Sequence, residues 1–94
     1  MTGVNTTTAL SLLKTRLNRL ADDTTLDEYL LRRIEGVIAE LGSTGIVLTD
    51  SAEDMMLVVD YAAYEYASRD KTGDLPDWLR RRIRYRWVQE VSRR

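Results

Sequence analysis

Several residue types that carry enzyme chemistry are missing from this chain of 94 residues. It contains no cysteine and no histidine. The lack of cysteine excludes disulfides, thiolate zinc sites and a cysteine nucleophile. The lack of histidine removes the commonest general base and the commonest metal ligand. We therefore expect a protein that is not an enzyme and needs no metal or cofactor.

Long apolar runs are absent as well. No stretch approaches the roughly 20 apolar residues that a membrane-spanning helix needs, and residues 1–8 lack the cationic start and apolar segment of a secretory signal. We expect no membrane partner and a reducing, cytoplasmic setting. Hydrophobic residues make up 44% of the chain and charged residues 31%, which is typical of a folded globular protein. The length fits a single domain, 1–94.

Apolar residues recur every three or four positions along most of the chain, which predicts helices. The expected helices cover about 8–21, 26–41, 52–71 and 76–91. Pro76, the only proline, is expected at the first position of the last helix, where its missing N–H costs nothing. We expect an all-α fold, a small bundle of about four helices, in which 75–94 is a basic C-terminal helix able to dock on a partner.

Capping residues mark the expected helix ends. Thr25 and Glu28 have the spacing of a capping box, and so do Ser51 and Asp54. Gly42 is suited to the residue just beyond a helix C-terminus. The first helix is expected to bury a face that includes Leu20.

A short loop over 42–50 has an apolar centre, Ile46, Val47 and Leu48, which we expect to be extended. Such a segment more often covers its own core than contacts a neighbour, although both interpretations stay open. The helix that follows is apolar around most of its circumference. Since a small domain has few elements to cover it, part of this helix is expected to meet another subunit.

The acidic residues have a simpler interpretation. Asp22, Asp23, Asp27 and Glu28 do not match the spacing of a calcium loop, so we interpret them as caps and a solvated turn. Asp54 and its acidic neighbours receive the same interpretation.

Charge is divided unevenly along the chain. Residues 80–94 hold seven arginines and one acid, whereas residues 1–79 hold seven basic and fourteen acidic side chains. Because the arginine run has few acids of its own, we do not expect a simple salt-bridged surface. Arginine interleaved with Trp and Tyr predicts a surface that binds either an acidic protein or nucleic acid.

The order of several segments between Leu26 and Arg82 carries a resemblance. A Leu-Val run leads into the aromatic stretch 57–66, followed by Arg69 and by Leu-Pro-Asp-Trp-Leu at 75–79. The acidic turn 21–23 and the amphipathic segment 30–38 precede them. In this order the chain resembles the head–tail connector (adaptor) proteins of tailed phages. Its C-terminal end is more basic than the resemblance requires.

The resemblance implies a structural protein of the virion neck, assembled in the host cytoplasm. About a dozen subunits would form a ring below the portal, extend the DNA channel without binding DNA specifically, and join a downstream connector or tail protein. An acidic body would suit such a channel, because like charge disfavours phosphate binding. The resemblance also implies portal contacts along the last helix. The candidates are Arg80, Arg81, Arg84, Trp87 and Arg94.

The contacts between subunits are expected on the apolar third helix and the preceding loop. The candidates are Leu57, Val58, Tyr61, Tyr64, Ile46, Val47 and Leu48. The alternative to a connector is a small helical protein that binds nucleic acid through residues 80–94, with affinity that falls steeply with salt.

Overall fold

The computed structural model describes residues 3–69 and 73–93. It contains the helices α1 (Thr6–Arg16), α2 (Asp27–Ser43), α3 (Ala52–Ala67) and α4 (Asp77–Ser92). No strand occurs in these two ranges. The predicted all-α fold is confirmed, and residues 46–49 form an extended loop between α2 and α3.

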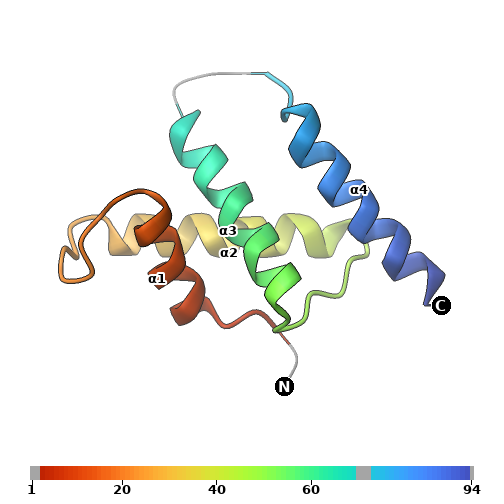
Figure 1. Ribbon diagram of the computed structural model, residues 1–94, viewed down its shortest axis with the longest axis horizontal. Coiled ribbons are helices and arrows are strands. Elements are labelled where there is room, and N and C mark those ends of the chain that lie inside the picture. The colour runs from red at the N-terminus through yellow and green to blue at the C-terminus, as the bar shows by residue number, and fades with distance from the viewer. Residues whose placement is uncertain (1–2, 70–72, 94) are drawn as a thin grey trace.

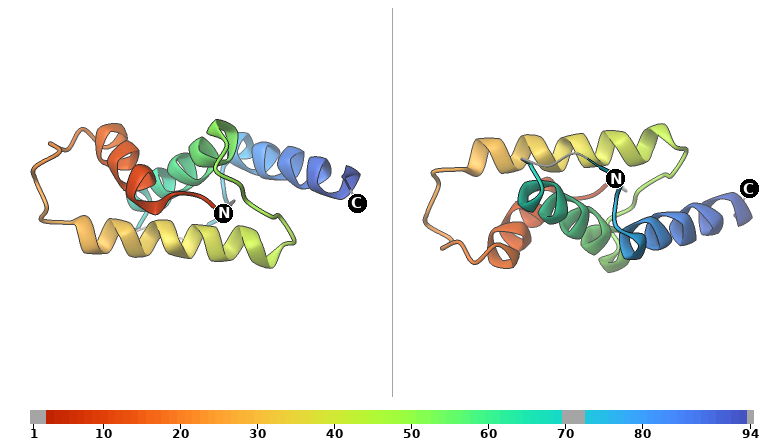
Figure 2. Two further views of the ribbon diagram at one scale, coloured as in Figure 1. Left: turned by 90° about the horizontal axis from the view of Figure 1, so that it is seen from below. Right: turned by 90° about the horizontal axis from the view of Figure 1, so that it is seen from above.

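The helices form two layers (Figures 1 and 2). One layer is α2 alone, which crosses behind the others. The second layer places α1, α3 and α4 side by side, with α3 in the middle and α4 running back alongside it. This central position explains why α3 is apolar around most of its circumference.

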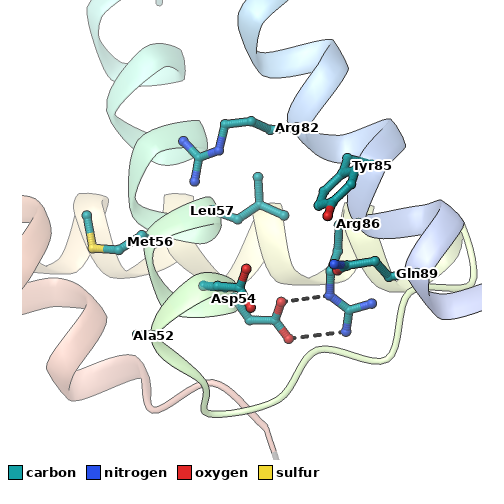
Figure 3. A pocket seen from close by; sticks show the side chains of 9 residues that line it. Ala52, Asp54, Met56, Leu57, Arg82, Tyr85, Arg86 and Gln89 are labelled. Carbon is teal, nitrogen blue, oxygen red and sulfur yellow. Dashed lines mark hydrogen bonds and ion pairs between the residues drawn. The ribbon is translucent and has the colours of Figure 1, made fainter.

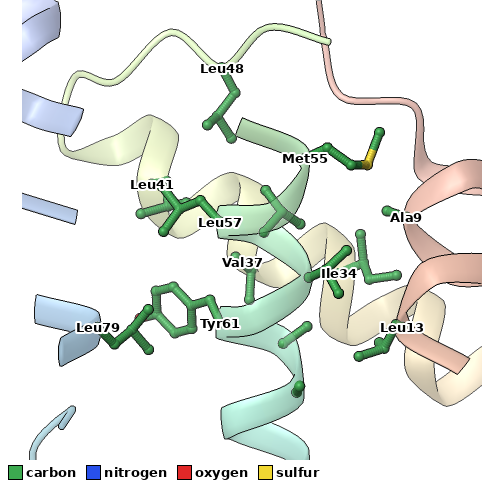
Figure 4. Packing of buried hydrophobic residues seen from close by; sticks show 14 of the residues in the cluster. Ala9, Leu13, Ile34, Val37, Leu41, Leu48, Met55, Leu57, Tyr61 and Leu79 are labelled. Carbon is green, nitrogen blue, oxygen red and sulfur yellow. The ribbon is translucent and has the colours of Figure 1, made fainter. Parts of the chain in front are cut away.

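The apolar core lies between the two layers (Figure 4). Side chains from α1 and α2 meet α3 on one side, and Tyr61 of α3 points toward Leu79 of α4 on the other. The core residues are Ala9, Leu13, Leu30, Ile34, Val37, Leu41, Ile46, Leu48, Met55, Leu57, Val58, Val59, Tyr61, Ala62, Ala63 and Leu79. The expectation that α3 lacks enough partners inside the domain is wrong, because α1, α2 and α4 all pack against it.

The first helix ends earlier than predicted, at Arg16. Asn18 takes a left-handed conformation with φ of 61°. The amide N–H of Arg19 donates to the carbonyl of Lys14 at 2.8 Å. This is the arrangement that closes many helices, with Asn in the position usually held by Gly. Because the chain turns here, Leu20 is 73% exposed and does not join the core.

Both predicted ends of α2 also shift. Leu26 is the N-cap and makes no side-chain cap bond, so the expected capping box of Thr25 does not form. Instead, the Thr25 amide N–H donates to Asp23 Oδ1 at 3.0 Å. Gly42 stays helical, and Gly45, with φ of 99°, makes the turn beyond the helix. Glycine suits that position because it has no Cβ to clash.

The N-terminal cap of α3 is confirmed in part. The Asp54 amide N–H donates to Ser51 Oγ at 3.1 Å, as predicted, but the Asp54 carboxylate is used elsewhere. The helix ends at Ala67 rather than Lys71, which lies outside the described residues. Pro76 is the N-cap of α4 rather than its first residue.

Candidate docking surface on the last helix

The inner face of α4, the side that packs against the rest of the domain, is not purely apolar. Leu79, Ile83, Arg86 and Glu90 face the body, at steps of four, three and four. Two of these four side chains are charged, yet Arg86 is only 6% exposed and Glu90 only 8%. The attachment of α4 therefore depends on buried polar contacts as well as on apolar packing.

Arg86 is the centre of those contacts (Figure 3). Its Nε lies 2.7 Å from Asp54 Oδ1, and its Nη2 lies 3.2 Å from Asp54 Oδ2. Its Nη1 donates to Glu90 Oε1 at 3.0 Å, and Nη2 also donates to the carbonyl of Val47 at 2.9 Å. Glu90 Oε1 in turn accepts from the Val47 amide N–H at 3.2 Å. One guanidinium thus joins α4 to the start of α3 and to the loop before it.

The two carboxylates in this network are held in their ionised forms. Burial opposes ionisation of Asp54, but hydrogen bonds from Arg86 and Thr49 outweigh it and lower the pKa of that carboxyl. Hydrogen bonds from Arg86 and from the Val47 amide lower the pKa of Glu90. Charged hydrogen-bond donors favour the ionised form in both cases.

Two more arginines of α4 pair with acids. Arg82 lies 2.5 Å from Asp60 Oδ2 of α3, and Arg80 lies 2.7 Å from Asp77 Oδ1. The expectation that the arginine run is not salt-bridged is therefore wrong for Arg80, Arg82 and Arg86. Two of the acids that balance these arginines, Asp54 and Asp60, were missed because they lie more than twenty positions away in the sequence.

A groove beside α4 brings together four of the five residues predicted to contact a partner. It is lined by Thr44, Leu75, Asp77, Arg80, Arg81, Ile83, Arg84 and Trp87. Leu75 and Ile83 are half-buried in it, and the Trp87 indole N–H donates to the Thr44 carbonyl at 3.0 Å. This bond fixes the indole beside the groove while 42% of Trp87 stays exposed. The fifth residue, Arg94, lies outside the described residues.

Arg81 and Arg84 differ from the paired arginines. Both are exposed, and neither forms an ion pair or side-chain hydrogen bond with any residue in 3–69 or 73–93. Within these described ranges, the donors of each guanidinium are not used by the chain and can bind an external acceptor.

The outward half of α4 adds apolar area, which includes the Trp and Tyr side chains that the sequence interleaves with arginine. Tyr85 is 66% exposed and Val88 is 48% exposed. Trp78 and Val91 are also partly exposed, at 42% and 38%. Val88 was not among the predicted residues, although the helical spacing from the buried positions 79, 83 and 86 places it on the opposite side. Exposed aromatic and arginine residues together are typical of protein interfaces.

Most of the predicted subunit contacts are not on the surface of the isolated chain. Leu57 and Val58 are 3% and 0% exposed, Tyr61 is 7% exposed, and Ile46 and Leu48 are 2% and 8% exposed. All five belong to the core of their own domain.

The remaining two predicted contacts differ in exposure. Val47 is 61% exposed, whereas Tyr64 is half-buried and its hydroxyl donates to the Asp74 carbonyl at 3.3 Å. Any subunit contact made by the predicted set is therefore centred on Val47.

The acidic turn before α2 is occupied by contacts within the chain. Asp23 pairs with Arg19 at 3.0 Å, and Asp27 pairs with the buried Lys14 at 2.9 Å. Hydrogen bonds from Thr25 lower the pKa of Asp23. These contacts stabilise the connection between α1 and α2. No helix within 3–69 or 73–93 is long and apolar enough to cross a membrane.

Comparisons with known proteins add no family. No family model, no curated protein and no solved structure matches this chain.

Proposed function

We propose that this protein is a structural adaptor, a head–tail connector of a tailed phage that forms a ring below the portal. The observation that supports it most is the groove of Arg80, Arg81, Arg84 and Trp87 on α4. These residues lie together on a surface that the domain does not need for its own core. Interfaces are typically centred on Trp and Arg side chains of this kind.

The way α4 is attached also suits an adaptor. Arg86 fixes the helix to the body through directional bonds to Asp54 and to the Val47 carbonyl, so the outer face has a defined orientation. A positioned surface loses less conformational freedom on binding than a mobile one. The partner we assign to this face is the portal, with the downstream connector or tail protein bound elsewhere on the ring.

Contacts between neighbouring subunits need a separate surface. The exposed Val47 lies on the loop that Arg86 holds, next to the C-terminal half of α4. A contact there with a different surface of the next subunit would repeat head to tail and close into a ring. The acidic body would line a channel through which DNA passes without specific binding.

The nucleic-acid alternative receives less support. Arg80, Arg82 and Arg86 each pair with a carboxylate of the same chain, so the arginine run offers fewer free cations to phosphates than its sequence indicates. Fewer phosphate contacts mean weaker, less salt-dependent binding.

Native mass spectrometry of the protein, alone and after co-expression with the portal protein of the same genome, tests the proposal. We expect a ring of about a dozen subunits bound to the portal. Monomers or dimers in both samples would overturn it.

A further inference from the structure

The groove beside α4 consists of two chemically different parts. Its more buried lining residues, Leu75 and Ile83, are apolar and are called its floor below, and the Trp87 indole also lines it. Its volume of 630 Å³ lies within the range of roughly 300 to 1,000 Å³ typical of sites that accept a ligand-sized group. The floor can therefore bury one or two apolar side chains.

The rim of the groove is cationic. Arg81 and Arg84 are three positions apart, so they are neighbours on the helix surface. Neither has a partner among the residues that the structure describes, whereas Arg80 is already paired with Asp77. Two adjacent guanidinium groups can each donate two parallel hydrogen bonds to a carboxylate.

We propose that this groove binds a short acidic and apolar segment of a partner protein. An aliphatic or aromatic side chain of the segment lies on Leu75, Ile83 and Trp87, and neighbouring carboxylates bind Arg81 and Arg84. The inference rests on the proposed function, since it names the chemistry of the partner at the same surface.

Charge complementarity favours a peptide over a nucleic acid. Asp77 lines the groove and raises the pKa of Arg80 through its hydrogen bond and charge, and the charge of the exposed Asp74 adds a smaller contribution. A nucleic acid carries a phosphate at every nucleotide, so some of its phosphates would be repelled by these carboxylates. A short peptide segment with one or two acids can place them at Arg81 and Arg84 only. The apolar floor also contributes to binding only if the ligand has an apolar side chain to bury.

Selection from a displayed library of random peptides tests the proposal directly. The full chain is immobilised to capture peptides. Peptides that also bind the double variant Arg81→Gln/Arg84→Gln are removed in a counter-selection step. The control is Arg32→Gln, which removes an exposed arginine of α2 that pairs with Glu28. Circular dichroism establishes that all variants keep the helical content of the parent.

We expect the selected peptides to combine Asp or Glu with Leu, Phe or Trp. Fluorescence anisotropy of a labelled selected peptide should show about tenfold weaker binding, or roughly 1.4 kcal/mol, to the double variant. Changing the acids of the peptide to amides, or its apolar residue to serine, should weaken binding similarly. Arg32→Gln should bind like the parent.

Four results would overturn the inference: no enrichment, selected peptides without acids, equal binding to the double variant, or stronger binding of single-stranded DNA than of the peptide. Self-association of the parent that is measured without portal protein and is lost in the double variant would also overturn it, because the occupant would then be a second copy. The four peptide and DNA results are independent of ring formation. A portal-bound ring without peptide binding defeats only this inference, and peptide binding without a ring defeats only the proposed function.

Discussion

The body formed by α1, α2 and α3 and the last helix, α4, are held in place by different kinds of contact. Among the described residues, the body and its loop between α2 and α3 contribute fifteen of the sixteen buried apolar residues, and α4 contributes Leu79 alone. Around Leu79, α4 is attached by Arg86 to Asp54 and by Arg82 to Asp60. The comparison shows that apolar packing builds the domain, whereas directional polar bonds orient the helix that carries the candidate docking surface.

The largest expected effect comes from the body. Ile34 is fully buried at the contact between α2 and α3, so Ile34→Ala leaves a cavity as well as losing apolar burial. We expect a loss of about 4 kcal/mol in the free energy of unfolding, measured by urea denaturation. Leu20→Ala, at a site 73% exposed, is the control and should change stability by less than about 0.5 kcal/mol. Similar losses in the two variants would contradict the assignment of the core.

The next effect concerns the polar attachment. Arg86→Ala leaves two carboxylates, Asp54 and Glu90, without their guanidinium partner in a buried site. We expect a loss of about 3 kcal/mol, because an uncompensated buried charge is costly. Hydrogen exchange should show lost protection in α4 while amides in the middle of α2 stay protected.

Arg84→Ala is the matched control, since the same residue type is exposed there. It should change stability by less than about 0.5 kcal/mol. Equal loss of protection in α2 and α4 of the Arg86→Ala variant would mean that α4 is not attached separately from the body.

Acid should weaken the same attachment. The pKa values of Asp54 and Glu90 are lowered in the folded protein, so the unfolded chain binds protons more readily. Their contribution is complete above the unfolded pKa, about 4, and is lost as the pH falls through the lower folded values. We expect stability to decrease from pH 5 downward, with protection in α4 lost before protection in α2.

The control for this pH dependence is the variant Asp54→Asn, whose stability should vary less steeply over the same range. Glu65 provides an internal contrast. Burial raises the pKa of its carboxyl, so its contribution to stability changes with pH in the opposite direction. A parent protein whose stability is constant down to pH 2 would contradict the account.

The smallest effect is expected at the second ion pair. Arg82 is partly exposed, and Asp60 also lies 3.5 Å from Arg16 of α1. Arg82→Gln therefore leaves Asp60 with a partner. We expect a loss of about 0.5 kcal/mol, measured by thermal unfolding at low salt and smaller at high salt. If Arg82→Gln loses as much stability as Arg86→Ala, the greater exposure of the Arg82–Asp60 pair does not make it weaker than the Arg86–Asp54 pair.

Local patterns in the sequence predicted the four helices and the cap at Ser51, because periodicity and capping are properties of neighbouring residues. They placed the end of the first helix too late, because Leu17 and Leu20 continue the spacing although Asn18 turns the chain. The premise that few elements of the domain cover α3 failed for another reason. Periodicity does not reveal how many helices surround a given one.

The candidate site was predicted unevenly. The residues Arg80, Arg81, Arg84 and Trp87 could be chosen because arginine and tryptophan cluster there, and the structure places all four on one groove. Which arginines lack an ion-pair partner within 3–69 and 73–93 could not be predicted. That depends on Asp54 and Asp60, which only the fold brings beside α4.

Binding of the portal by variants of the groove tests the central claim most directly. The parent, Arg81→Gln/Arg84→Gln and Arg32→Gln are each co-expressed with the portal protein of the same genome, and the complexes are measured by native mass spectrometry. The account predicts a portal-bound ring for the parent and for Arg32→Gln, and its loss in the double variant. Equal portal binding by all three proteins, or by none, would contradict it.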